Sequence, residues 1–415
     1  MAVAAQPLAS APTPTPAPAP VPHPLRERNF RMLWAGSAIS LLGDQFYLVA
    51  LPWVVLQHTG SAIAMGTIMM AAAIPRAVLM LLGGALTDRT SPRKILMSTA
   101  TARTLFVAAI GFLLWFHLLQ LWQLYLLGFA FGVADAFSVP AALAFMPSLV
   151  KQEQLVAANS VFQTTAQFTM IAGPTPAALI IKALGAAWAF FLDAISFLFI
   201  LGALWRLPDP ARPAAARPPL WRSIINGLSS VGRDVPLRSL VLVIAMLNLC
   251  TSGPMGVGLP YLAKTKFGSP AAFAFLMSAA AAGGLVGALL AGVWKIRRRG
   301  VFILGACAFL SVCLGSIGLA QRLWLIAGVL FVMLVAAGMA NVHIISWIQQ
   351  RVEPAVRGRI MSVVMLSGFG LLPVSLAVAG FMLTWNLKWT FLLAGAGMLL
   401  VTAFGALQKE VRGIA

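Results

Sequence analysis

Twelve long apolar runs dominate this sequence and leave few folds open to it. Each is about as long as the 20 or so residues with which a helix crosses a bilayer. In lipid the backbone must satisfy its own hydrogen bonds, so such runs form helices. The runs lie at 31–56, 62–86, 95–116, 122–147, 158–182, 186–207, 236–262, 270–294, 301–320, 323–348, 360–383 and 386–407. The sequence therefore predicts an all-α membrane protein with twelve transmembrane helices.

The distribution of charge agrees with a membrane protein and predicts its orientation. Only 9% of residues are charged, whereas a soluble domain carries about 25%. The net charge of +19 could indicate a nucleic-acid partner, but Lys and Arg gather in alternate connections, such as 89–94 and 295–299, and the others are nearly neutral. This positive-inside pattern predicts a multi-pass protein of the cell (inner) membrane with both termini cytoplasmic. The lipid bilayer is its expected partner, and nucleic acid is not.

A stretch rich in Pro, Ala and Arg divides the runs six and six, and the halves look like a degenerate repeat. Six plus six helices around a central cytoplasmic loop is a transporter architecture. We expect a disordered Ala/Pro-rich cytoplasmic tail at 1–24, an N-terminal six-helix bundle at 25–207, a cytoplasmic linker at 208–235, a C-terminal six-helix bundle at 236–408 and a cytoplasmic tail at 409–415.

The loop between the second and third runs is short and charged, and it suggests a part that holds two helices in one arrangement. The segment contains Gly84, Asp88, Arg89, Arg93 and Lys94. The Asp88 carboxylate could cap the N-terminus of a facing helix, where backbone N–H groups are free. By pseudo-symmetry that helix is the eleventh. We interpret these residues as a conformational latch; the alternative is charge that only sets topology.

These residues resemble the loop motif between helices 2 and 3 of the major facilitator superfamily, although Ser91-Pro92 replaces its usual glycine. The segments 28–34, 158–160 and 191–197 look like the branch of macrolide-efflux proteins and enterobactin exporters. The resemblance covers nearly everything from 28 to 412 and implies two pseudo-symmetric six-helix bundles. Of the antiporter signature on helix 5, the sequence keeps only Gly173-Pro174. That pair predicts a kink or a close helix contact.

Ionisable side chains inside a bilayer are costly unless they are paired or hydrated, so each is a functional candidate. The spans contain Asp44, Arg76, Arg103, Asp135 and Asp193, all in the first half. We predict that Asp44, near the midplane, couples protons or binds substrate; pairing with an arginine is the alternative. Asp135 is expected to form a structural ion pair with Arg76 or Arg103. Asp193 is expected to make a packing hydrogen bond near the outer face.

The sequence contains no phosphate-binding glycine loop and no metal-ligand spacing, so we expect no cofactor, no metal and no enzyme activity. Our preferred hypothesis is a monomeric, proton-coupled exporter that works by alternating access. Its small-molecule substrate would be an amphiphilic organic compound such as a drug, a macrolide or a siderophore. One alternative is an uptake or facilitative transporter of a small solute. Another is a non-transporting membrane sensor on the same fold.

Overall fold

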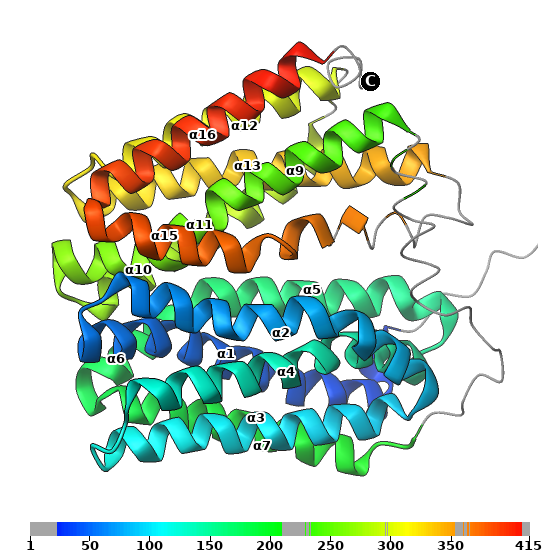
Figure 1. Ribbon diagram of the computed structural model, residues 1–415. Coiled ribbons are helices and arrows are strands. Elements are labelled where there is room, and N and C mark those ends of the chain that lie inside the picture. The colour runs from blue at the N-terminus through cyan, green and yellow to red at the C-terminus, as the bar shows by residue number, and fades with distance from the viewer. Residues whose placement is uncertain are drawn as a thin grey trace, which may run out of the picture.

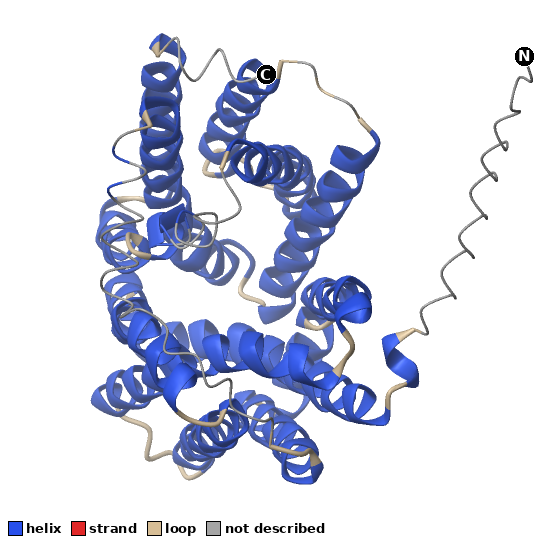
Figure 2. Ribbon diagram, turned by 90° about the vertical axis from the view of Figure 1, so that its right-hand side faces the viewer, coloured by secondary structure: helices blue, strands red, loops and turns tan. Residues whose placement is uncertain are grey.

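The computed structural model describes residues 23–209, 229, 232, 234–294, 296, 298–352, 360, 363–364 and 366–408, apart from the surroundings of residues 81, 84, 85 and 88. Most of the two tails, most of the linker and the segment 353–359 lie outside these residues. The described residues form helices joined by loops, with no strand among them (Figure 2).

The first half forms one bundle, the lower layer in Figure 1. Its helices are α1 (Arg28–Thr59), α2 (Ala62–Arg89), α3 (Pro92–Trp115), α4 (Leu121–Phe145), α5 (Leu155–Ala172), α6 (Pro174–Leu184) and α7 (Ala186–Arg206), with short 3-10 turns at Pro24–Arg26, Met146–Leu149 and Gln152–Gln154. Local chemistry sets several of these bounds. Ser61 and Ser91 cap α2 and α3 by accepting a backbone N–H, and Gly60 ends α1 with a φ of 61°.

The second half forms the upper layer. It contains α9 (Val235–Gly253), α10 (Leu259–Leu262), α11 (Pro270–Val293), α12 (Arg299–Ile317), α13 (Leu323–Arg351), α15 (Leu372–Trp385) and α16 (Leu387–Leu407). Two π-helical turns, Pro254–Gly258 and Ala263–Phe267, flank α10. Together α9, α10 and these turns form one span of residues 235–267, where the sequence predicted a single regular helix at 236–262.

Within the described residues, 11 helices are long and apolar enough to cross a membrane. The fifth predicted span, 158–182, is divided into α5 and α6, which meet at Gly173. Pro174 has no backbone N–H, and its ring crowds the preceding turn, so the helix breaks there. The two helices together supply the twelfth crossing.

The two bundles contact each other closely near one end of the molecule. We call the end where α7 finishes and α9 begins the linker end, on the right in Figure 1, and the opposite end the far end. Near the far end α2 crosses α15 so closely that a Cβ on Gly66 would lie 2.6 Å from the Leu376 carbonyl oxygen. Lys264 lies 4.8 Å from the centre of the Trp53 ring, a second contact between the bundles. A close glycine contact and a cation–π contact thus hold the bundles together at the far end.

Candidate functional site

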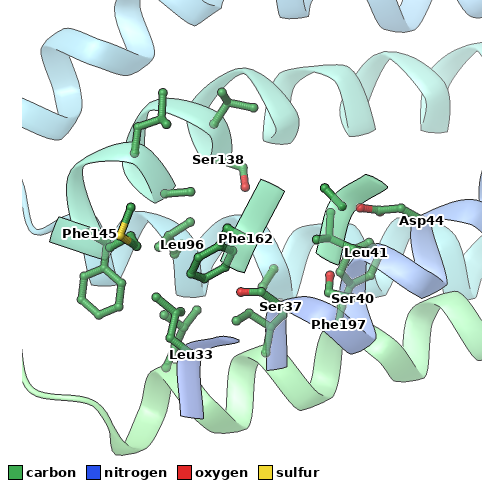
Figure 3. Close-up of a pocket in the computed structure, with 18 of the residues that line it drawn as sticks. Leu33, Ser37, Ser40, Leu41, Asp44, Leu96, Ser138, Phe145, Phe162 and Phe197 are labelled. Carbon is green, nitrogen blue, oxygen red and sulfur yellow. The ribbon is translucent and has the colours of Figure 1, made fainter. Parts of the chain in front are cut away.

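A cavity of about 540 Å³ lies inside the first bundle, among α1, α3, α4, α5 and α7 (Figure 3). It occupies the halves of these helices nearer the linker end. Its wall is mostly apolar, with Leu33, Leu41, Leu96, Phe145, Phe162 and Phe197, and the polar side chains are Ser37, Ser40, Ser138, Asn159 and Gln163. Asp44 and Arg103 line its inner end. The cavity therefore presents a mainly apolar surface, scattered uncharged polar groups and one charged pair.

Four ionisable side chains from four helices form one network at that inner end. Arg103 Nη2 lies 2.6 Å from Asp44 Oδ1, and Arg76 Nη1 lies 3.1 Å from Asp135 Oδ2. Arg103 Nη1 is also 4.0 Å from Asp135 Oδ1, so α1, α2, α3 and α4 are linked. The pairing that was left open for Asp135 involves both arginines. Asp44 pairs with Arg103, and it remains a candidate for coupling because its side chain is 26% exposed and faces the cavity.

Aromatic rings hold the Arg103 guanidinium in place. Its Cζ lies 4.7 Å from the Phe131 ring centre and 4.3 Å from the Phe197 ring centre, both within cation–π range. Tyr47 in turn stacks on Phe131, with the two ring centres 4.7 Å apart. Sequence reasoning missed these aromatic neighbours, because apolar runs contain many rings and nothing in their spacing marks those that face an arginine.

Asp193 lies where α7 packs against α1, and its side chain is fully buried. A Cβ on Gly43 would lie 2.8 Å from Asp193 Oδ1, so only glycine allows this approach of α1. The hydroxyl of Ser196 is 3.4 Å from the same oxygen. The sequence predicted a packing hydrogen bond for Asp193 near the outer face and named no neighbour for it. The structure puts it against the residue that precedes Asp44.

The described part of the charged loop acts inside the first bundle. Arg93 Nε donates to the Leu204 carbonyl oxygen at 2.6 Å, and Arg93 Nη2 donates to that of Trp205 at 2.8 Å. The Ser91 hydroxyl also hydrogen-bonds the Asp209 carboxylate. These contacts tie the start of α3 to the end of α7. Arg89 and Lys94 are exposed.

The surroundings of Gly84 and Asp88, and the segment before the eleventh span, lie outside the described residues. The latch between Asp88 and that span stays a prediction.

The contacts of Arg93 lead to a stability prediction. Its positive charge caps the C-terminal end of α7, where free carbonyls carry partial negative charge, an interaction of about 1 kcal/mol at a partly exposed site. We expect Arg93→Ala to lower the midpoint of thermal unfolding of the detergent-solubilised protein by a few degrees. Arg89→Ala is the matched control, because that side chain is exposed, and it should leave the midpoint unchanged. Equal loss in both variants would mean that loop charge alone matters.

Gly173 allows a second close approach to α1. A Cβ there would lie 2.6 Å from the Thr169 carbonyl oxygen and would also meet the side chain of Gln45. On the same helix as Thr169, Gln167 Nε2 donates to the Ala281 carbonyl oxygen of α11 at 3.1 Å, which crosses between the bundles. The break at Gly173-Pro174 thus lies beside α1 and near a contact with the second bundle.

Comparison with known proteins agrees with this architecture. A family model described as Major Facilitator Superfamily matches residues 33–375 and 241–412. Macrolide efflux protein A of Streptococcus pyogenes is 26% identical over 295 residues, covering 68% of this chain and 70% of that protein. The multidrug efflux pump Tap of Mycolicibacterium fortuitum is 27% identical over 363 residues, covering 85% and 87%.

Among solved structures, a bacterial homologue of the iron transporter ferroportin in an inward-facing state has a TM-score of 0.72 at 17% identity. The match covers 92% of this chain and 98% of that one. These likenesses confirm the predicted all-α membrane fold and the resemblance noted in the sequence.

Proposed function

This chain belongs to the major facilitator superfamily, a group of transport proteins rather than enzymes, and we propose that it exports an amphiphilic organic compound in exchange for protons. The observation that carries the proposal is the cavity, whose apolar wall ends at the Asp44–Arg103 pair. Apolar walls with a few placed polar groups suit compounds such as a drug, a macrolide or a siderophore. The efflux relatives support export as the direction.

The arrangement of charge supports an inward-facing state. The basic connections lie at the linker end, which places that end in the cytoplasm under the positive-inside rule. The cavity lies toward this end, and the Gly66 and Lys264 contacts hold the bundles together at the other. Alternating access then requires that the far end open while the linker end closes. The proposal places the protein in the inner membrane and requires only one chain, because the cavity is lined by residues of a single chain.

Exchange with protons follows from competition at one acid. A proton on Asp44 would remove the negative charge that now pairs with Arg103, and a bound substrate would alter the same pair from the cavity side. A ligand shifts a conformational equilibrium only by its difference in affinity between the states. Because the Asp44–Arg103 pair responds to both the proton and the substrate, it can give each of them a different affinity in the two conformations.

Transport into inverted membrane vesicles tests the proposal. With an acidic vesicle interior, we expect a macrolide or a cationic amphiphilic dye to accumulate inside, and collapse of the pH gradient should abolish accumulation. Vesicles without the protein are the control. Equal rates with and without the gradient would contradict proton coupling and favour the facilitative alternative. The reduced antiporter signature on helix 5, of which only Gly173-Pro174 remains, is consistent with that alternative.

Topology can be tested independently of substrate. We expect a cysteine at Thr59, beside the far-end turn after α1, to react with a membrane-impermeant maleimide added to intact cells. A cysteine at Thr90, at the linker end of α2, should react only after the cells are opened. Both variants are made in a background without Cys250, Cys307 and Cys313. The reverse pattern of labelling would invert the proposed orientation.

A further inference from the structure

Asp193 is a carboxylate that the ion-pair network does not account for. Its side chain is 0% exposed, and among the described residues no group donates a hydrogen bond to Oδ2. The Ser196 hydroxyl donates to the Asp193 backbone carbonyl at 2.7 Å and is only 3.4 Å from Oδ1, so it does little for a negative charge. An ionised carboxylate left this way in an apolar interior is strongly unfavourable.

The charges around Asp193 do not compensate for it. Arg76 and Arg103 already pair with two other acids of the bundle, Asp44 and Asp135. Asp193 is therefore a third acid without an arginine of its own. Asp44 and Tyr47 of α1 and Arg103 of α3 are close enough to Asp193 to interact with its charge. The Tyr47 hydroxyl has no partner among the described residues. The ionisable group of α6, Lys182, is exposed near the far end.

The packing at Asp193 is too close for a metal ion. Hard cations bind through about six oxygens. Here the described side chains place Ser196 Oγ near the carboxylate, and the backbone of Gly43 is pressed against both. Phe190 and Phe197, one turn to either side along α7, are buried as well. A proton is the cation that neutralises a carboxylate without needing further ligands or space.

We propose that Asp193 holds a proton in this state and is the inner member of a two-acid path that reaches the cavity through Asp44. The inference rests on the proposed proton-coupled transport and names a site for its coupling ion. Asp44 follows Gly43 directly in α1, so the two acids lie on either side of the α1–α7 contact.

Arg103 is placed to control the transfer. Its guanidinium lies over Phe197, four residues and about one helical turn from Asp193, and its Nε has no described partner. When Arg103 turns from Asp44 toward Asp193, the O–H bond of the Asp193 carboxyl breaks and the proton bonds to Asp44. The negative charge then lies on Asp193 beside the guanidinium, and Asp44 is neutral and open to the cavity. No other reactant is needed.

Infrared spectroscopy of the purified full-length protein tests where the proton lies. At neutral pH, we expect the carbonyl stretching band of a protonated carboxyl group, and Asp193→Asn should remove it. Glu153→Gln is the matched control, because that acid is exposed on a 3-10 turn outside the network, and it should keep the band. A band that survives Asp193→Asn overturns the proposal.

Ser196→Ala provides a second measurement that does not require replacement of the acid. The Ser196 hydroxyl lies against the carboxyl, so its loss should shift the band without removing it, and an unshifted band overturns the proposal. The infrared result needs no substrate, so the proposal of a proton on Asp193 and the proposal of proton-coupled export can fail separately. A band assigned to Asp193 without gradient-driven uptake supports the buried proton and rejects proton-coupled export. Gradient-driven uptake by the wild type, with no such band, rejects Asp193 as the site.

Discussion

Replacing Arg103 with methionine should nearly abolish the yield of folded protein. Its side chain is 12% exposed and pairs with Asp44 at 2.6 Å and with Asp135 at 4.0 Å. Methionine would leave two acids in the bundle interior with one arginine between them. Removing one partner of a buried pair costs about 3–5 kcal/mol, a large part of the stability of a typical fold. Monodisperse protein recovered by size-exclusion chromatography is the measurement.

Two further variants show whether charge is the cause. Adding Asp44→Asn to Arg103→Met should restore much of the yield, because it removes the carboxylate that lost its partner. Arg103→Lys keeps the charge but not the planar fork that lies between Phe131 and Phe197, so it should give an intermediate yield. Equal losses for the single and double variants would show that shape, and not charge, makes Arg103 necessary.

Asp44→Asn should abolish accumulation driven by a pH gradient while substrate exchange remains measurable. The amide has the shape of a protonated acid and cannot ionise, so it fixes the site in one of its two forms. The measurement compares uptake into inverted vesicles, with the gradient imposed, with exchange of labelled substrate in its absence. Asparagine keeps an oxygen that can accept from Arg103, and Asp135 still lies 4.0 Å from Arg103 Nη1, so we expect the variant to fold.

Asp135→Asn is the matched comparison for Asp44→Asn. Asp135 pairs with Arg76 at 3.1 Å and lies near Arg103, and its side chain is 14% exposed. Its loss leaves Arg76 without a carboxylate partner and Arg103 with Asp44 alone, so this variant should lower the amount of folded protein, although the 41% exposure of Arg76 limits the loss. If Asp44→Asn still concentrates substrate against a gradient, Asp44 is not required for coupling, and Asp135 becomes the next residue to test.

The fold was largely predictable from this sequence, and the site was predictable only as a set of residues. Apolar length alone gave the spans, because lipid leaves few alternatives to helices. The break at Gly173-Pro174 could be foreseen from the proline, but the π-helical turns around α10 have no comparable signal. The five intramembrane charges stood out because they are costly in lipid.

Which charges pair depends on how the helices rotate about their axes, and apolar composition does not specify rotation. Depth along the helix suggested that Arg103 and Asp135 meet, as they do. Depth did not show that Asp193 packs against Gly43, next to Asp44, because it carries no information about helix rotation. For the same reason, the sequence interpretation of Arg93 as part of a latch gave no sign that its side chain binds the end of α7.

The uneven placement of charge bears on how such a chain can diversify. Every acid within the predicted spans belongs to the first half, although the halves look like copies of one ancestral unit. If the first bundle alone responds to protons, as we propose, the second bundle is free of that constraint. Mutations that reshape the apolar second bundle can then change which molecules are carried without disturbing the energy source. Lineages built this way could acquire new substrates through ordinary apolar substitutions.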